Sequence, residues 1–258
     1  MSNKKHEYNW DFNTGVDYKW LTIHCEDWVH QEVAKYINTK FKKNIEILVL
    51  WAWTWAFDYR LNDLGYKNIT SSDINKQNYK YNSKNFICAN LNDNFSINHS
   101  KNYDLIVCIE IIEHLENTQL FLKELSKITK ESWEIIITTP NLHSFFSRIY
   151  QVFCWSPSFF DSIPNDFWHI SPILYWSFIH QINKANLNLQ KCYSITLFST
   201  KNNILQKLIK SPIFLIYYIL YFLFQIILYN IITKIIKSNI PKTLINWKIA
   251  IYILKKWK

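Results

Sequence analysis

The order of apolar and polar residues predicts strands and helices that alternate along most of the chain. Mostly apolar runs, such as Ile45–Leu50 and the run that begins at Tyr103, are typical of parallel strands buried on both faces. Between such runs, Gln119–Lys130 and Ile173–Ala185 carry apolar residues at helical spacing. This alternation predicts an α/β fold with a mostly parallel sheet and helices on both faces.

Seven strands are expected in a Rossmann-like sheet whose last strand is antiparallel. They lie near residues 45–50, in a run that ends at Asp73, and near residues 86–92, 103–109, 133–139, 189–198 and 247–254. We divide the chain into an α/β domain with a helical preface at residues 1–204, an apolar helical insertion at 205–240, and the final strand at 241–258.

The segment Ile45–Asn75 combines a strand, a short turn, a helix and a second strand that ends at Asp73. In a nucleotide-binding βαβ unit, an acid about twenty residues after the turn meets the ribose hydroxyls. The turn carries Trp51, Trp53 and Trp55, although positive φ and close approach to a ligand favour glycine there. The flanking strands and helix therefore fit the nucleotide-binding βαβ pattern, whereas the turn does not.

Composition shows the same discrepancy, because the chain has 2 Gly and 12 Trp, whereas roughly 18 Gly are expected at this length. We infer that many of these Trp are glycines in the living protein, from a genetic code in which UGA means Gly but was translated as Trp. The alternative is a true Trp-rich turn that blocks a cofactor site. With Gly at the three positions, I-L-V-L-G-A-G-T-G-A closely resembles motif I of class I S-adenosylmethionine-dependent methyltransferases. Val49 departs from the family, which usually has an acid there.

A second block resembles the same family and contains no Trp. Residues 110–117 read E-I-I-E-H-L-E-N, similar to the segment after a central strand in methyltransferases related to quinone-biosynthesis O-methyltransferases. Residues 139–141 read T-P-N and residues 166–172 read D-F-W-H-I-S-P. Both resemble segments of this group, the second with Trp in a Gly position.

The resemblance implies S-adenosylmethionine as the cofactor, bound where the parallel strands end. Asn90 stands where the family often has an acid that binds the adenine amino group, and its carbonyl can still accept that hydrogen bond. The cofactor-binding residues implied are Trp51, Ala52, Trp53, Thr54, Trp55, Asp73, Ile74, Asn90, Leu91 and Glu110.

His114 and His169 are the catalytic candidates, because a hydroxyl acceptor needs a base to remove its proton. A further hypothesis is a divalent-metal site made by Glu110, Glu113, His114 and His169, a set that suits Mg²⁺, Mn²⁺ or Zn²⁺. This set resembles the metal ligands of small-RNA 3′-end methyltransferases. The alternative is that Glu110 positions the cofactor, Glu113 begins a helix and His114 acts as a base or only packs.

The apolar stretch Pro212–Lys234 is long enough to span a bilayer, which takes about twenty residues. A true span would put the last strand across the membrane from its own sheet. An interfacial helix or hairpin within residues 205–240 is therefore preferred, because the stretch is rich in Tyr and flanked by Lys. A lid on the domain and a membrane span are the alternatives.

The net charge of +9 is spread along the chain, so solvated surface lysines are its ordinary interpretation. Attraction to an anionic membrane or an acidic substrate is the alternative. Five Cys without a C-x-x-C pair, and an N-terminus without an apolar secretory segment, indicate a cytoplasmic protein with reduced thiols. Peripheral attachment to the inner face of the membrane is compatible with this location. The oligomeric state is not fixed by the sequence.

These observations together predict a methyltransferase that O-methylates a small-molecule, lipid-linked or glycan acceptor. One alternative is a catalytically inactive, methyltransferase-like module that binds a partner at the membrane. Another is an RNA methyltransferase, which the positive charge and the E-x-x-E-H pattern favour. Nucleic acid remains the weaker partner, because no RNA-binding module is recognisable.

Overall fold

The structure is a computed structural model. It describes residues 17–23, 25, 27–50, 55–75, 85–160, 169–194, 223, 227 and 249–256. The turn residues Trp51, Ala52, Trp53 and Thr54 lie outside this part of the chain, as does nearly all of the insertion expected at 205–240.

The described residues form a mostly parallel, seven-stranded sheet in the order β5-β4-β3-β6-β7-β9-β8. Its strands are β3 (Ile47–Leu50), β4 (Ile69–Asp73), β5 (Phe86–Cys88), β6 (Tyr103–Cys108), β7 (Thr129–Pro140), β8 (Leu187–Ser194) and β9 (Ile249–Lys256). Only β9 is antiparallel to its neighbours, and it lies between β7 and β8. The predicted fold class, including the antiparallel last strand, is confirmed.

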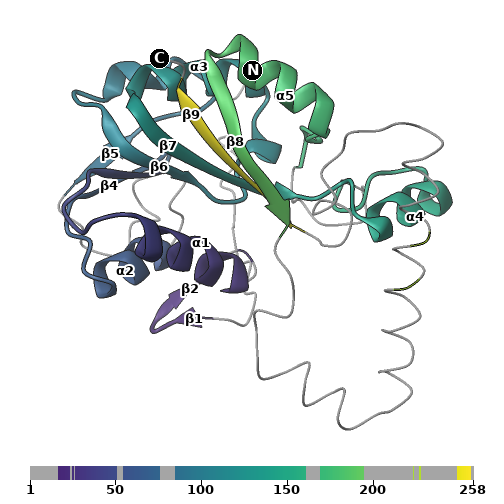
Figure 1. Cartoon of the computed structure of the whole chain (residues 1–258), viewed down its shortest axis with the longest axis horizontal. Coiled ribbons are helices and arrows are strands. Elements are labelled where there is room, and N and C mark those ends of the chain that lie inside the picture. Colours follow the sequence, from purple (N-terminus) through teal and green to yellow (C-terminus); the bar gives the residue numbers. More distant parts are fainter. Residues whose placement is uncertain are drawn as a thin grey trace, which may run out of the picture.

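Two helical layers cover the sheet, as Figure 1 shows, with α1 and α2 on one face and α3 and α5 on the other. The helices are α1 (Asp27–Lys40), α2 (Ala56–Asp63), α3 (Thr118–Ile128), α4 (Phe145–Cys154) and α5 (Tyr175–Lys184), with 3₁₀ turns η2 (Phe95–Asn98) and η3 (Ile112–His114). A small hairpin, β1 (Asp17–Tyr18) and β2 (Leu21–Thr22), packs near α2.

Alternate residues of β6 fill two separate cores, which explains why this strand is apolar from Leu105 onward. Leu105 and Val107 of β6 pack toward α1 and α2, whereas Ile106 and Cys108 pack toward α3 and α5. Side chains on successive residues of a strand point to opposite faces. A strand covered on both sides therefore favours apolar residues on both of its faces.

Helix α4 is an element that the sequence pattern did not predict. It begins after β7, where the Ser144 hydroxyl accepts a hydrogen bond from the Ser147 N–H (3.1 Å) and caps its first turn. In Figure 1, α4 lies apart from the two helical layers. Within the described part of the chain, no helix combines the length and the apolar character needed to cross a membrane.

Candidate active site

The predicted site residues that the structure describes lie where the parallel strands end. Asp73 is the last residue of β4, and Glu110 lies two residues after β6. Trp55 precedes α2 after the turn that leaves β3. The carboxyl edge of an open α/β sheet is where such proteins bind their ligands. This edge is therefore the candidate active site.

Trp55 has a backbone conformation that favours glycine. Its φ is 71° and its ψ is 18°, which is left-handed, and it directly precedes α2. Its side chain is fully buried, and its ring centroid lies 5.3 Å from that of Phe86. A bulky residue at positive φ is an outlier, because its Cβ approaches the following carbonyl. The side chain of Trp55 thus occupies space beside the edge where a cofactor would bind.

Asp73 and Ile74 lie at the end of β4 with opposite exposure. The Asp73 carboxylate is buried, and its Oδ1 accepts a hydrogen bond from the Asn75 N–H (2.9 Å). Ile74 is 65% exposed. A buried acid beside an exposed aliphatic side chain matches the needs of a nucleoside, whose ribose offers hydroxyls and whose base offers an apolar face.

Asn90 and Leu91 follow β5 in a turn held by its own polar side chains. The Asn90 amide donates to Asp93 Oδ2 (2.9 Å), and its carbonyl oxygen accepts from the Asn92 N–H (3.1 Å). Leu91 is buried. The turn thus fixes the Asn90 amide, and its carbonyl oxygen keeps a second lone pair.

Glu110 is held in an uncommon conformation by Thr138 of β7. Its φ is 49°, which is left-handed. The Glu110 N–H donates to Thr138 Oγ1 (3.0 Å), and the Thr138 hydroxyl donates to Glu110 Oε1 (2.8 Å). Backbone strain of this kind persists where surrounding contacts over-determine it, often at functional sites.

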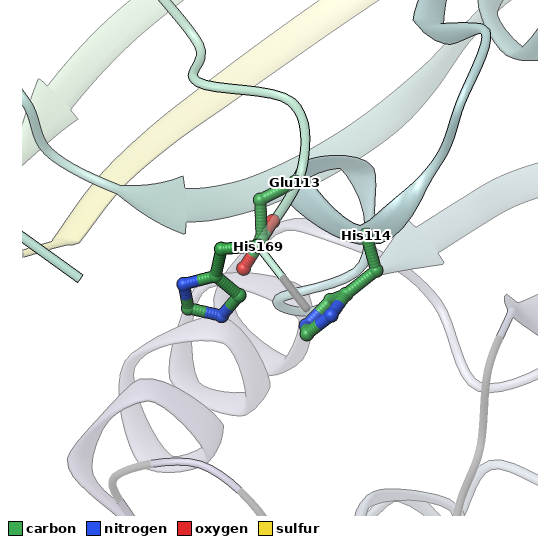
Figure 2. A group of neighbouring side chains, drawn as sticks. All are labelled: Glu113, His114 and His169. Carbon is green, nitrogen blue, oxygen red and sulfur yellow. The ribbon is translucent and has the colours of Figure 1, made fainter. Parts of the chain in front are cut away.

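Glu113, His114 and His169 form a cluster of potential metal ligands. Figure 2 shows the Glu113 carboxylate and the two imidazoles converging on one region. One ligand atom from each lies within 4.8 Å of the others, and the two imidazole centroids are 4.6 Å apart. Glu110, the fourth ligand predicted from the sequence, is not in this cluster. Three protein ligands leave coordination positions open for a substrate, as catalytic metal sites require.

Main-chain hydrogen bonds join the two distant segments that build this cluster. The Glu113 carbonyl accepts from the N–H groups of Ile170 (2.9 Å) and Ser171 (2.9 Å). The Ser171 hydroxyl donates to the carbonyl of Leu115. These bonds fix His169 beside His114. The segments that carry the E-H-L and H-I-S-P motifs are thus bonded directly to each other in the structure.

The His169 ring is oriented by Phe159. A carbonyl oxygen can only accept, so the contact of 2.8 Å between His169 Nδ1 and the Phe159 carbonyl requires that Nδ1 carries the proton. The lone pair then resides on Nε2, the arrangement found in metal-binding histidines. Burial lowers the pKa of His169, and the Phe159 carbonyl partly opposes this shift.

The Glu113 carboxyl group is fully buried, and neither of its oxygens has a hydrogen-bonding partner among the described residues. Burial raises its pKa well above the ordinary value, and the charge of Glu110 raises it further. The nearby Thr139 hydroxyl opposes this rise in the pKa of Glu113, although it makes no hydrogen bond of normal geometry with the carboxyl group. A buried carboxyl group without partners costs free energy. A bound cation would remove that cost.

Sequence reasoning missed three residues that organise the site: Thr138, Ser171 and Phe159. Thr138 and Ser171 lie within or beside quoted motifs, so their hydroxyls could have been assigned to positioning roles. Phe159 acts through its backbone carbonyl, and no sequence signal marks that role.

The sequence matches no protein-family model and no curated protein, so structural likeness alone carries the comparison. A SAM-dependent methyltransferase from Archaeoglobus fulgidus is 16% identical, with a TM-score of 0.55 over 89% of this chain and 94% of that one. The N-methyltransferase NodS from Bradyrhizobium japonicum, in complex with S-adenosyl-L-homocysteine, is 9% identical (TM-score 0.50, 90% and 88%). The cyclase SpnF is 10% identical (TM-score 0.54, 94% and 85%).

These likenesses define the fold as the one adopted by class I S-adenosylmethionine-dependent methyltransferases. Because SpnF is a cyclase with the same fold, the fold by itself leaves the reaction open.

Proposed function

We propose that this protein is an S-adenosylmethionine-dependent methyltransferase that methylates a hydroxyl group of a small-molecule, lipid-linked or glycan acceptor. The observation that carries the proposal is the convergence of Glu113, His114 and His169 at the carboxyl edge of the sheet. Proton-accepting groups and potential metal ligands at this edge suit activation of a hydroxyl nucleophile.

The residues of this edge fit the cofactor. Asp73 is a buried acid at the end of β4 that would accept hydrogen bonds from the ribose hydroxyls. Ile74 would pack on the adenine, and Asn90 would accept from its amino group. Glu110, held by Thr138, would bind the amino group of the methionine part. Bound S-adenosylmethionine supplies an electrophilic methyl group.

The β3–α2 turn must be glycine-rich for the cofactor to bind, and we propose that positions 51, 53 and 55 are glycines in the natural chain. The left-handed backbone of Trp55 supports this proposal. A second Trp supports it independently, because Trp155 caps α4 with a φ of 57° while its side chain is 92% exposed. Left-handed residues at this point after a helix are usually glycine. UGA codons at these positions would support the proposal, and UGG codons would overturn it.

A divalent metal held by Glu113, His114 and His169 is the second part of the proposal. The buried carboxyl group of Glu113 and the Nδ1-protonated form of His169 both fit a metal ligand. A bound Mg²⁺, Mn²⁺ or Zn²⁺ would lower the pKa of an acceptor hydroxyl. Without a metal, His114 would itself accept the hydroxyl proton. In both cases the residues align the acceptor oxygen with the methyl group, which is the main requirement of methyl transfer.

The experiment uses the full chain made with Gly at positions 51, 53 and 55, beside the chain as printed. Calorimetric binding of S-adenosylmethionine to the glycine form alone supports both the turn and the cofactor. Methyl transfer to extracted lipids, glycans and small molecules then tests the activity, with and without a chelator. Loss of transfer in chelator supports the metal, whereas full activity in chelator overturns it.

The same experiment distinguishes the methyltransferase from the main alternative, a catalytically inactive module. A catalytically inactive module would bind S-adenosylmethionine without transferring methyl groups to any acceptor. A glycine form that does not bind the nucleoside at all overturns the methyltransferase proposal. Transfer to RNA in preference to the other acceptors would favour the RNA methyltransferase instead.

A further inference from the structure

The side chains that α4 exposes to solvent are mostly apolar, with Gln151 as the polar exception. Ile149, Val152 and Phe153 are exposed at helical spacing, with Val152 69% and Phe153 77% exposed. The helix contains no acidic residue, and Arg148 is its only charged one. Surface helices normally present polar residues to water. An apolar face without charge instead indicates a surface that is covered by something else.

This face is adjacent to the candidate active site. Helix α4 leaves the sheet at the carboxyl end of β7, the edge at which Glu113 and His114 lie. Phe159, which follows α4 and is itself partly exposed, has the carbonyl that orients His169. Ile170, the neighbour of His169, is exposed as well. The residue whose carbonyl orients His169 and the residue that follows His169 thus both expose apolar side chains.

The chain that joins β8 to β9 starts and ends at the same edge of the sheet. Ser194, the last residue of β8, pairs with Ala250 of β9, so the chain between them leaves and returns at this edge. That intervening chain contains the stretch Pro212–Lys234, which has no charged residue before its terminal Lys. Its two described residues, Leu223 and Ile227, are one helical turn apart and exposed.

We propose that the α4 face is a contact with an anionic membrane surface, which brings the acceptor to the site from the lipid phase. Two features favour a membrane over a protein partner. The chain between β8 and β9 contains a long uncharged apolar stretch, and the whole chain carries a net charge of +9. Apolar insertion combined with attraction to anionic lipids is how interfacial helices bind membranes. The source of the acceptor rests on the function proposed above, whereas the membrane contact does not.

The test is flotation of the full chain with vesicles of phosphatidylcholine, with or without phosphatidylglycerol, in the absence of cofactor and acceptor. We expect binding to the anionic vesicles and about tenfold weaker binding to the neutral ones. The double variant Val152→Asp, Phe153→Asp should lower partition by at least about tenfold, because it removes two exposed apolar side chains that would insert into the bilayer. Ile97→Asp is the matched control. Ile97 is 82% exposed but lies in η2, before β6 and away from the carboxyl edge, so partition should be unchanged.

An environment-sensitive fluorophore gives a second measurement at the same face. Cys154 is exposed at the end of α4, and Cys88, the other exposed thiol among the described residues, can be replaced by Ser. A blue shift of the label on Cys154 with anionic vesicles, larger than that of a label on Cys88, supports the contact. Unchanged emission at Cys154, or equal flotation of the double variant, overturns it.

Light scattering of the unbound protein tests whether a second copy of the chain, rather than a membrane, covers the α4 face. A dimer that the double variant converts to monomer, with no flotation of the unaltered chain, would overturn the membrane contact. Because no step uses S-adenosylmethionine, failure of this proposal is distinguishable from failure of the methyltransferase proposal.

Discussion

The imidazole rings of His114 and His169 lie 4.6 Å apart between centroids, at an interplanar angle of 73°. The two residues come from segments far apart in the sequence, and main-chain bonds to Glu113 bring them together. Together with the buried Glu113 carboxyl group, they form the cluster of potential metal ligands. The first two predictions concern this cluster.

Glu113→Gln should lower the affinity for Mn²⁺ or Zn²⁺ by at least about 100-fold, because it removes a ligand. The free energy of unfolding should stay equal or rise, because a buried ionisable group becomes a neutral amide of the same shape. Calorimetry and thermal unfolding measure the two effects. Glu124→Gln is the control, since this buried carboxylate is already bonded to Ser96 and Lys127. It should lose stability and keep its metal affinity.

Ser171→Ala should release the segment that carries His169, because it removes the hydrogen bond to the Leu115 carbonyl. We expect a loss of about 1 kcal/mol in the free energy of unfolding. Methyl transfer by the glycine form should fall about tenfold or more, since small displacements are costly in catalysis. Ser126→Ala removes a similar bond, to the Lys123 carbonyl, on the exposed part of α3. Equal activities of the two variants would contradict a positioning role for Ser171.

Trp155→Gly should raise the free energy of unfolding by about 1 kcal/mol, because it relieves a left-handed conformation at an exposed position. Trp176→Gly is the control, since Trp176 is also exposed but lies within α5. That change should lower stability by up to about 1 kcal/mol, because glycine disfavours a helix. Chemical denaturation of both variants checks the opposite signs. A loss in both would contradict the assignment of glycine to position 155.

Asp58→Asn should stabilise the protein at neutral pH. Burial raises the pKa of Asp58 well above its ordinary value of 3.8, so the folded state binds more protons than the unfolded state above that value. The unaltered protein therefore loses stability as the pH rises from about 4, and the neutral amide does not. The gain should grow with pH and vanish below about pH 4 in denaturation curves. Ser71 can still donate to the amide oxygen.

Asp63→Asn on the same helix is the control with the opposite sign. Its exposed carboxylate has a pKa lowered first by Lys19, so the pair stabilises the folded state above the ordinary pKa. Its removal should cost a small amount at neutral pH and nothing in acid. A gain at neutral pH for both variants would contradict the assigned pKa of Asp58.

The sheet was predictable because its strands are covered on both faces, which makes β6 apolar at each position from Leu105 to Cys108. Strand ends also fixed the positions of Asp73, Glu110 and Glu113, since the motifs follow the strands directly. Helix α4 was not predictable by the same reasoning. Its exposed residues include Ile149, Val152 and Phe153 and only one strongly polar side chain, Gln151, so its pattern lacks the broad polar face that marks a surface helix.

The residue types of the site were predictable from the sequence, but the arrangement of their side chains was predictable only in part. The sequence placed His169 near His114 through motif resemblance, and the bonds from Ile170 and Ser171 to the Glu113 carbonyl explain why. Glu110 was expected beside Glu113 as a ligand, but its Oε1 accepts from Thr138 and it lies outside the ligand cluster. The backbone geometry determines that Glu110 lies outside the ligand cluster, and the order of residues in the sequence does not reveal this.

The pairing of Ser194 with Ala250 makes the end of β8 and the start of β9 immediate neighbours. A short reverse turn could therefore join the two strands and leave the sheet complete. The sheet therefore does not depend on the length of the chain that joins β8 to β9.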